Sequence, residues 1–224
     1  MALTILLVER VLSFVKKRNE QLFRNLLLRT CRMPIHAYFS YWLMIFKEQL
    51  GRPAGERIAL YDNLQDFLLS DDFFNAVRQF NFNRRIGEDK TYAQYFYDKM
   101  NEVADKFQNM LSKYGSKLTY NDVKLFEHFG GGAFMYTVFM VMKFLSEATF
   151  TIQEDDEEEV PLVPHINSIN NIRRDHFNEH FTKFVELVNE YNAAVDNEYQ
   201  RWTLQSLMTL GTIEAANNNP AIDW

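Results

Sequence analysis

Three residue types that interrupt or cross-link folds are scarce in this sequence. Its 224 residues include one cysteine, five prolines and eight glycines. The single thiol, Cys31, cannot form an internal disulfide, and it is more typical of core packing than of a nucleophile, because no spacing pairs it with a histidine. So few glycines and prolines provide too little turn chemistry for a fold of many short strands. The composition therefore favours helices.

A surplus of positive charge is also missing. The 24 Lys and Arg residues stand against 30 Asp and Glu, and the resulting net charge of −6 argues against a nucleic-acid binder. Residues 1–33 depart from this average, because they hold seven basic and two acidic residues, a local balance of 7 − 2 = +5. We interpret them as a basic N-terminal arm that faces an anionic surface or partner, or as a targeting segment. An ordinary solvated helix face is the plain alternative.

No apolar run is long enough to span a bilayer, which takes about 20 residues. The N-terminal run is interrupted by Glu9 and Arg10, and a second run over 133–145 contains Lys143. The second run predicts a buried or interfacial helix rather than a membrane span, and we assign this apolar helix to residues 131–152.

Aromatic residues are abundant. The 20 Phe and 11 Tyr carry too much apolar surface for a disordered chain, and a chain of this length can bury a core without disulfides. Apolar periodicity predicts a first helix that Pro34 stops, a second over about 35–50 that ends at Gly51, and a third over about 56–80.

A first heptad seam follows these helices. Its apolar positions are spaced by steps of 4, 3, 4, 3 and 4, namely Phe96, Met100, Val103, Phe107, Met110 and Tyr114. Gly115 is typical of a C-cap. A stripe of this kind needs a covering helix, which comes either from the same chain, as a hairpin, or from another subunit. We predict these residues as an interface.

Two local signals come next. Thr119 is placed to cap a short helix, with Asp122 three residues later. The glycines 130–132 lack the preceding strand and the following Lys-Ser/Thr of a phosphate loop, so they predict a hinge or a tight join between helices.

A second seam lies near the C-terminus, beyond an acidic linker at 153–165. It has the same heptad steps, and we predict its residues as a further interface: Phe177, Phe181, Phe184, Val188, Tyr191, Val195 and Trp202. A helix of about 35 residues from Ser168 would be about 50 Å long, and we assign 166–224 to a helical extension. Together the seams predict an all-α fold of long helices with coiled-coil-like heptad contacts and helical hairpins, and with little or no sheet.

One spacing resembles a catalytic motif. His176, Glu179 and His180 fit the His-x-x-Glu-His pattern of inverted zinc peptidases, in which two histidines hold a metal and the glutamate activates water. The alternative is that both histidines only flank the packed face, one residue before Phe177 and Phe181. A third metal ligand has no supporting motif, and we predict no catalytic, cofactor-binding or metal-binding residue.

Three pieces of the sequence carry a family resemblance by their order and spacing. They are residues 12–20 followed by Leu26-Leu27, Pro34 and the aromatic stretch 38–42; residues 88–94 just before the first seam; and residues 118–123 with Phe126 and Phe129 behind them. In this order they resemble subunit d of the mitochondrial F-type ATP synthase, a component of the peripheral stalk. The resemblance covers roughly 10–130, so we assign 1–130 to a subunit d-like helical region, and 131–224 has no counterpart.

The resemblance implies a non-catalytic stator subunit that holds the catalytic head against rotation during proton-driven ATP synthesis. Its implied partners are peripheral-stalk subunits, especially subunit b-like helices, on the matrix side of the mitochondrial inner membrane. The basic arm could serve import or contact with anionic lipid. No cofactor, nucleic acid or small-molecule substrate is expected. A free-standing helical adaptor or self-assembling scaffold is the first alternative, and a metal hydrolase is the second.

Overall fold

The computed structural model describes residues 2–87, 90–148, 169 and 172–209. The helices in this part of the chain are α1 Ala2–Thr30, α2 Arg32–Leu50, α3 Ala54–Ile58, α4 Leu64–Leu68, α5 Asp71–Gln79, α6 Tyr92–Tyr114, α7 Tyr120–Gly131, α8 Ala133–Ala148 and α9 Arg174–Ala194. Residues 204–209 are also helical. Strands are limited, within the described residues, to an antiparallel pair of two residues each, β1 Arg85–Ile86 and β2 Lys90–Thr91. The predicted all-α class is confirmed.

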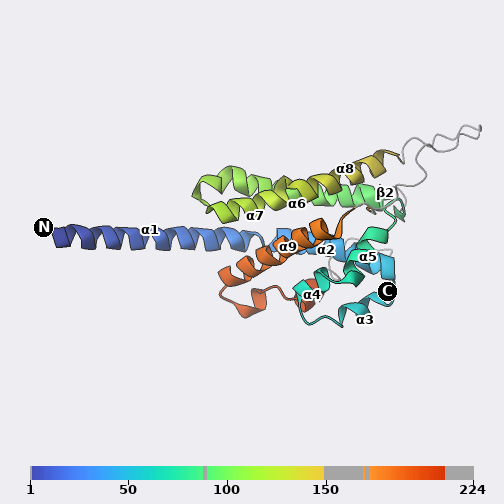
Figure 1. Ribbon diagram of the computed structural model, residues 1–224, viewed down its shortest axis with the longest axis horizontal. Coiled ribbons are helices and arrows are strands. Elements are labelled where there is room, and N and C mark those ends of the chain that lie inside the picture. The colour runs from blue at the N-terminus through green and yellow to red at the C-terminus, as the bar shows by residue number, and fades with distance from the viewer. Residues whose placement is uncertain (1, 88–89, 149–168, 170–171, 210–224) are drawn as a thin grey trace, which may run out of the picture.

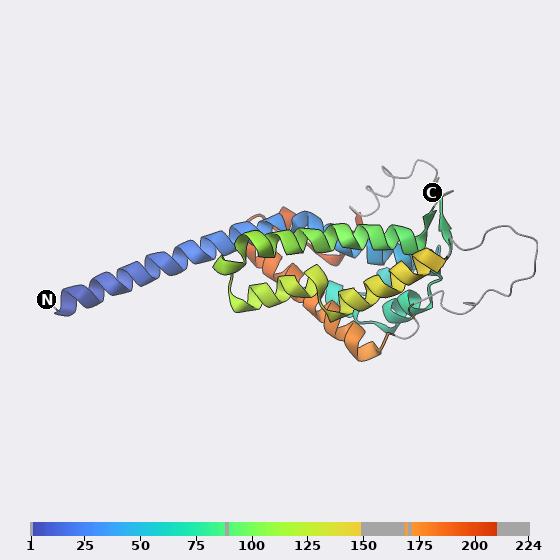
Figure 2. The same ribbon diagram turned by 90° about the horizontal axis from the view of Figure 1, so that it is seen from above.

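The molecule consists of a helical body and one projecting helix. Figure 1 shows α1 and α2 following one another along the long axis, with α6, α7 and α8 on one side of α2 and α3, α4 and α5 on the other. The N-terminal half of α1 extends beyond every other helix in both views (Figures 1 and 2). Within the described residues, no helix has the length and apolar character that a membrane crossing needs.

The boundary between α1 and α2 lies at Cys31, which corrects the expected stop at Pro34. The Cys31 N–H bonds the carbonyl of Leu28 at 2.9 Å, as a turn, and α2 begins at the next residue. Pro34 stands in the first turn of α2, where a missing N–H breaks no helical hydrogen bond. The proline therefore fits the start of a helix rather than ending one. The predicted end of this second helix at Gly51 is confirmed, with a φ of 66°.

Three short helices replace the single helix predicted over 56–80. The Asn63 side chain accepts the Asp66 N–H and begins α4, and the Ser70 side chain accepts the Phe73 N–H and begins α5. Each cap satisfies an N–H that a helix start leaves without an intrahelical partner. The polar residues at these two positions therefore divide an apolar pattern that looks continuous.

The join between α7 and α8 is tight. Gly131 has a φ of 149°, and a Cβ on Gly132 would lie 2.8 Å from the carbonyl oxygen of His128. This agrees with the predicted tight join at the glycines 130–132. Beyond this join α8 continues along α6, so α7 and α8 lie end to end against the same helix (Figure 2).

The C-terminal helix α9 is shorter than the predicted strut of about 35 residues. It has 21 residues, and Val195 after it is extended. The chain turns back, because the Asn192 side chain bonds the backbone of Trp202 twice, at 2.7 Å to its N–H and 2.8 Å to its carbonyl. The strut prediction was therefore wrong. The predicted acidic linker 153–165 and residues 210–224 lie outside the described residues.

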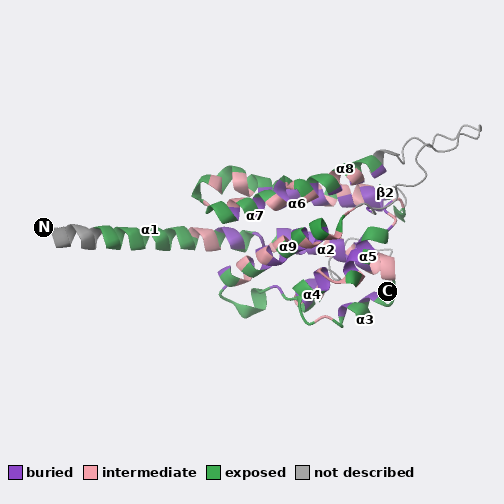
Figure 3. Cartoon of the chain, viewed as in Figure 1, coloured by how far each residue is buried: buried purple, intermediate pink, exposed green. Residues whose placement is uncertain are grey.

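One continuous hydrophobic core joins the segments before and after the linker. Side chains from α2, α5, α6, α7, α8 and α9 all contribute to it, and Figure 3 shows the buried positions along the inward faces of these helices. Trp42 of α2 lies near the centre, with its ring 4.8 Å from that of Phe96 and 5.4 Å from that of Phe181. The helices before and after residue 131 are thus packed as one unit.

Candidate functional site

The first predicted seam lies inside this core for most of its length. Phe96, Met100, Val103 and Phe107 are buried, and the ring of Phe107 lies 5.5 Å from that of Phe129 in α7. The covering helices are α2, α7 and α8 of the same chain.

The C-terminal end of this seam packs less closely. Met110 is half-buried beside Cys31, and Tyr114 is about one-third exposed with its ring 5.7 Å from that of Phe23 in α1. This end of α6 therefore meets the base of α1.

The second predicted seam is also buried within the chain. Its members are all covered, namely Phe177, Phe181, Phe184, Val188, Tyr191, Val195 and Trp202. Phe181 packs on Phe73 and Trp42, while the ring of Trp202 stacks on that of His36 at 5.5 Å.

These positions correct where a partner surface should be sought. For the first stripe the sequence left open whether the same chain or another subunit covers it, and it predicted the second stripe as an interface. In the structure helices of the same chain cover both stripes, except at the partly exposed Met110 and Tyr114. A side chain with no accessible surface cannot touch a partner without unfolding its own core. The coiled-coil geometry expected from the heptad spacing stays a prediction.

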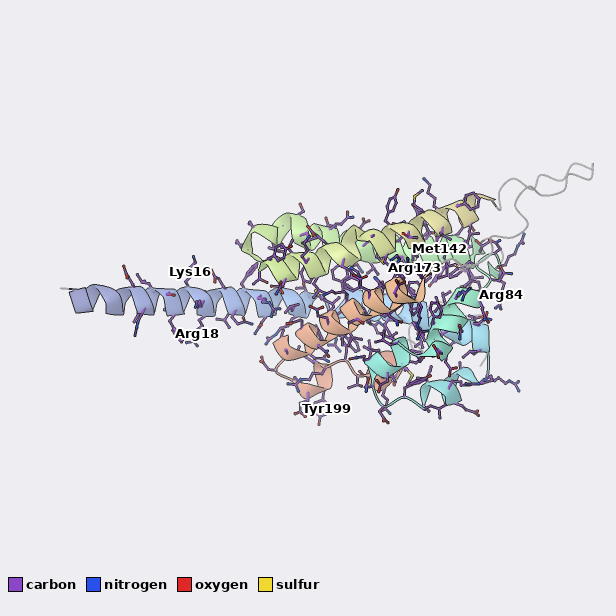
Figure 4. All side chains as sticks on the ribbon, in the orientation of Figure 1. Lys16, Arg18, Arg84, Met142, Arg173 and Tyr199 are labelled. Carbon is purple, nitrogen blue, oxygen red and sulfur yellow. The ribbon has the colours of Figure 1, made fainter. Side chains whose placement is uncertain are left out.

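One apolar surface that the body leaves uncovered is on α1. Residues 9–22 are all exposed, and several of them are large and apolar. The exposed fractions are 63% for Leu12, 66% for Phe14, 59% for Leu22 and 63% for Leu26. Figure 3 shows the projecting helix exposed along the length that it describes, and Figure 4 places Lys16 and Arg18 on it, away from the body.

A partly buried ionic anchor holds the base of this helix. Arg24 donates from Nε to both carboxylate oxygens of Asp122 at 2.9 Å and from Nη2 to Oδ1 at 2.7 Å, and its Nη2 also reaches Glu190 at 2.8 Å. Asp122 is almost fully buried. The anchor therefore ties α1 to α7 and α9 at one point.

The electrostatics of the anchor favour its charged form. Hydrogen bonding to Asp122 raises the pKa of Arg24 above its ordinary value. Burial alone would raise the pKa of Asp122, but the hydrogen bonds from Arg24 and Thr119 outweigh it and hold the pKa below its ordinary value. Both groups thus stay ionised near neutral pH.

Asp122 is positioned by the cap that the sequence predicted. The Thr119 side chain accepts the Asp122 N–H and donates to Oδ2 at 2.6 Å, so Thr119 caps α7 as expected. A second contact lies nearby, where Arg29 donates to the carbonyl of Ala194 and to Asp196, both at 2.6 Å. An open groove of about 770 Å³ lies beside the anchor, between α1 and the turn before α7.

The His-x-x-Glu-His motif is divided between two environments. His176 and Glu179 are exposed, whereas His180 is fully buried. Among the residues that the structure describes, no group of three or more His, Cys, Asp or Glu side chains could hold a metal ion. His176 therefore lies outside the packed face and His180 lies within it, so the two do not both flank that face as the plain alternative expected.

His180 belongs instead to a buried network of hydrogen-bonded polar side chains. Its Nδ1 lies 2.7 Å from Nε2 of His128, and its Nε2 bonds the hydroxyl of Tyr38. Burial lowers the pKa of His180 well below its ordinary value, and the neighbouring His128 lowers it further. Burial also lowers the pKa of His128. A neutral imidazole can bond two neighbours at once, as His180 does with His128 and Tyr38. We interpret this buried network of hydrogen bonds as part of core packing.

Sequence reasoning missed the Arg24 anchor and the histidine pair. Thr119 and Asp122 were visible as a cap, but their partner Arg24 lies 98 residues away in the chain. A capping box at the start of α6, formed by Thr91 and Gln94, was also missed, although its Thr-x-x-Gln spacing could have been read.

Comparison with known proteins leaves the chain without an assigned relative. No protein-family model, curated protein or solved structure matches it.

Proposed function

We propose that this protein is a non-catalytic structural subunit of the ATP synthase peripheral stalk, similar to subunit d. It would contact subunit b-like helices on the matrix side of the mitochondrial inner membrane. In this role it holds the catalytic head against rotation during proton-driven ATP synthesis.

The observation that carries the proposal is the long basic helix anchored to the body at its base. A stator subunit needs lateral contact along other helices rather than a pocket. An exposed helix with apolar side chains, such as Leu12, Leu22 and Leu26, provides such a contact. The Arg24–Asp122 ion pair fixes the direction in which this helix leaves the body.

The anchor also relates two pieces of the family resemblance. Arg24 lies between residues 12–20 and Leu26 of the first piece, Asp122 lies within the third, and the two side chains are bonded. The second piece supplies the cap of α6, because Thr91 and Gln94 form its capping box. Residues 12–20 of the first piece lie on the projecting helix, but each piece has a residue buried in the body, namely Leu27, Thr91 and Asp122, which supports reading the pieces together.

Native-gel electrophoresis tests the proposal. The protein is expected to comigrate with ATP synthase from mitochondrial membranes, and mass spectrometry of that band should detect it in proportion to the stalk subunits. A chain found only as a free monomer would contradict the proposal.

A self-assembling scaffold is the second candidate, because the same exposed apolar residues could bind another copy. It predicts a particle size that rises with concentration in light scattering of the purified chain alone. A size that stays monomeric over a hundredfold concentration range rejects it.

A further inference from the structure

The exposed side of α1 carries a third heptad pattern, which the body leaves uncovered. Leu12, Val15, Asn19, Leu22 and Leu26 follow one another by steps of 3, 4, 3 and 4. Val15 is 46% exposed and the three leucines are about 60% exposed. In heptad terms Leu12, Asn19 and Leu26 stand at a positions, and Val15 and Leu22 at d positions. Val8 and Ile5 continue the same spacing in the sequence.

This seam points away from the body. Successive residues of a helix are about 100° apart, so Leu22 and Leu26 lie on the side opposite to Arg24 and Leu28. Leu28 is buried and Arg24 bonds Asp122, so that side faces the body. The helix therefore has one face committed to its own chain and another face, with Leu12, Val15, Leu22 and Leu26, that the body leaves exposed. Asn19 of the seam also lines the open groove beside the anchor.

We infer that this seam pairs with one helix of another protein that has an apolar heptad stripe and acidic flanks. The inference deepens the proposed function and rests on it only for the identity of the partner. Lys16 stands at an e position and Arg18 at a g position, on the two sides of the seam. A partner helix with Glu or Asp at its own flanking positions would meet both cations.

The charges favour such a partner over a second copy of this chain bound in parallel. In a parallel pair of copies, Lys16 would face Val11 and Arg18 would face Phe23, so neither cation would gain an opposite charge. A helix with acidic flanks would supply an opposite charge to each of the two cations.

The middle of the seam favours a helix over a lipid surface. Asn19 lies at the centre of the stripe, between Val15 and Leu22. A buried Asn at an a position is a known means of fixing register in coiled coils, where it bonds a polar group of the facing helix. In a bilayer the same amide would face hydrocarbon without a partner. The polar position therefore fits a protein helix.

Cross-linking from single cysteines tests the pairing in the assembled complex. Burial raises the pKa of the native Cys31 thiol to about 12, so it stays unreactive and introduced cysteines can be labelled selectively. A photoactivatable maleimide is placed on Leu12→Cys, Val15→Cys or Leu22→Cys, and on the matched exposed controls Ser13→Cys and Lys17→Cys. The complexes are then isolated and illuminated.

The expected result is a cross-link from positions 12, 15 and 22 to one segment of one other polypeptide, at least tenfold above positions 13 and 17. That segment should show heptad spacing and acidic flanks. Equal cross-linking at all five positions, cross-links to lipid, or cross-links to a second copy would each overturn the inference.

A charge variant gives an independent readout. Leu12→Glu is expected to lower recovery of the protein in the complex at least tenfold without changing the thermal midpoint of the free chain, while Ser13→Glu changes neither. Unchanged recovery of Leu12→Glu overturns the pairing.

These outcomes separate the inference from the proposed function. Periodic cross-links to a helix outside ATP synthase retain the pairing and reject the stalk assignment. Comigration with ATP synthase without periodic cross-links retains the stalk assignment and rejects the pairing.

Discussion

At the scale of single residues, we expect the polar groups in the core or at its edge to influence stability more than those on the open surface. Asp122 is almost fully buried and pairs with Arg24, whereas Lys90 and Asp98 form an ion pair at 3.0 Å that is about half exposed. A buried charge that loses its partner costs far more than an exposed one. The two pairs should therefore respond differently to the same substitution.

Asp122→Ala is expected to lower the free energy of unfolding by about 2 kcal/mol or more, because it removes charge-assisted hydrogen bonds from Arg24 and leaves that cation with Glu190 alone. Urea unfolding measures the change. Asp98→Ala is the control and should leave the unfolding midpoint nearly unchanged. Equal effects of the two substitutions would show that the anchor adds no stability.

The buried histidines predict a dependence of stability on pH. His180 and His128 have folded pKa values below their ordinary value of 6.5, so the unfolded chain binds more protons than the folded one as the pH falls. Their contribution is complete above pH 6.5 and is lost on acidification, at up to about 1.4 kcal/mol per pH unit for each group. Urea unfolding between pH 7.5 and 5 checks this.

His128→Gln should make that slope shallower, since one of the two groups is removed. His176→Gln is the matched control, because His176 is exposed, and it should leave the slope as it is. A slope that both variants retain in full would place its origin in other groups.

At the scale of elements, the residues that begin and end helices shape the fold more than the length of the apolar pattern does. The apolar pattern over 56–80 and the seam through Trp202 both predicted longer helices than the structure has. Asn63 and Ser70 divide the first, and the bonds between Asn192 and Trp202 turn the second back. The α7–α8 join is likewise set by backbone contact at Gly132.

Gly132→Ala should destabilise the protein by about 1–3 kcal/mol, because the new Cβ would press on the carbonyl of His128 and force the backbone to shift. Gly55→Ala is the control, since a Cβ at Gly55 meets nothing within 4 Å and Ala suits a helix. Thermal unfolding of both variants separates the two outcomes. Similar midpoints would mean that the join relaxes without cost.

At the scale of the whole molecule, the body and the projecting helix are expected to have separate roles. The core cluster begins at Leu27, so the N-terminal half of α1 adds little to folding. The exposed apolar side chains of this half would be buried by contact with a partner.

Deletion of residues 1–16 should therefore leave the thermal midpoint of the body within a few degrees of the full chain and abolish its recovery in the complex. Calorimetry and native gels measure the two effects. A large fall in the midpoint would instead make the arm a structural part of the body.

The sequence by itself determined the helical class, the cap at Thr119, the glycine join and the basic character of the arm. These follow from composition and from interactions within a few residues. Only the tertiary structure decided that the same chain covers most of both predicted seams, that Arg24 reaches Asp122, and that His180 is buried while His176 is not. Periodicity shows that a face will be buried, but the helix that covers it is chosen by packing between distant segments. The heptad on α1 is the one of the three that the body leaves open.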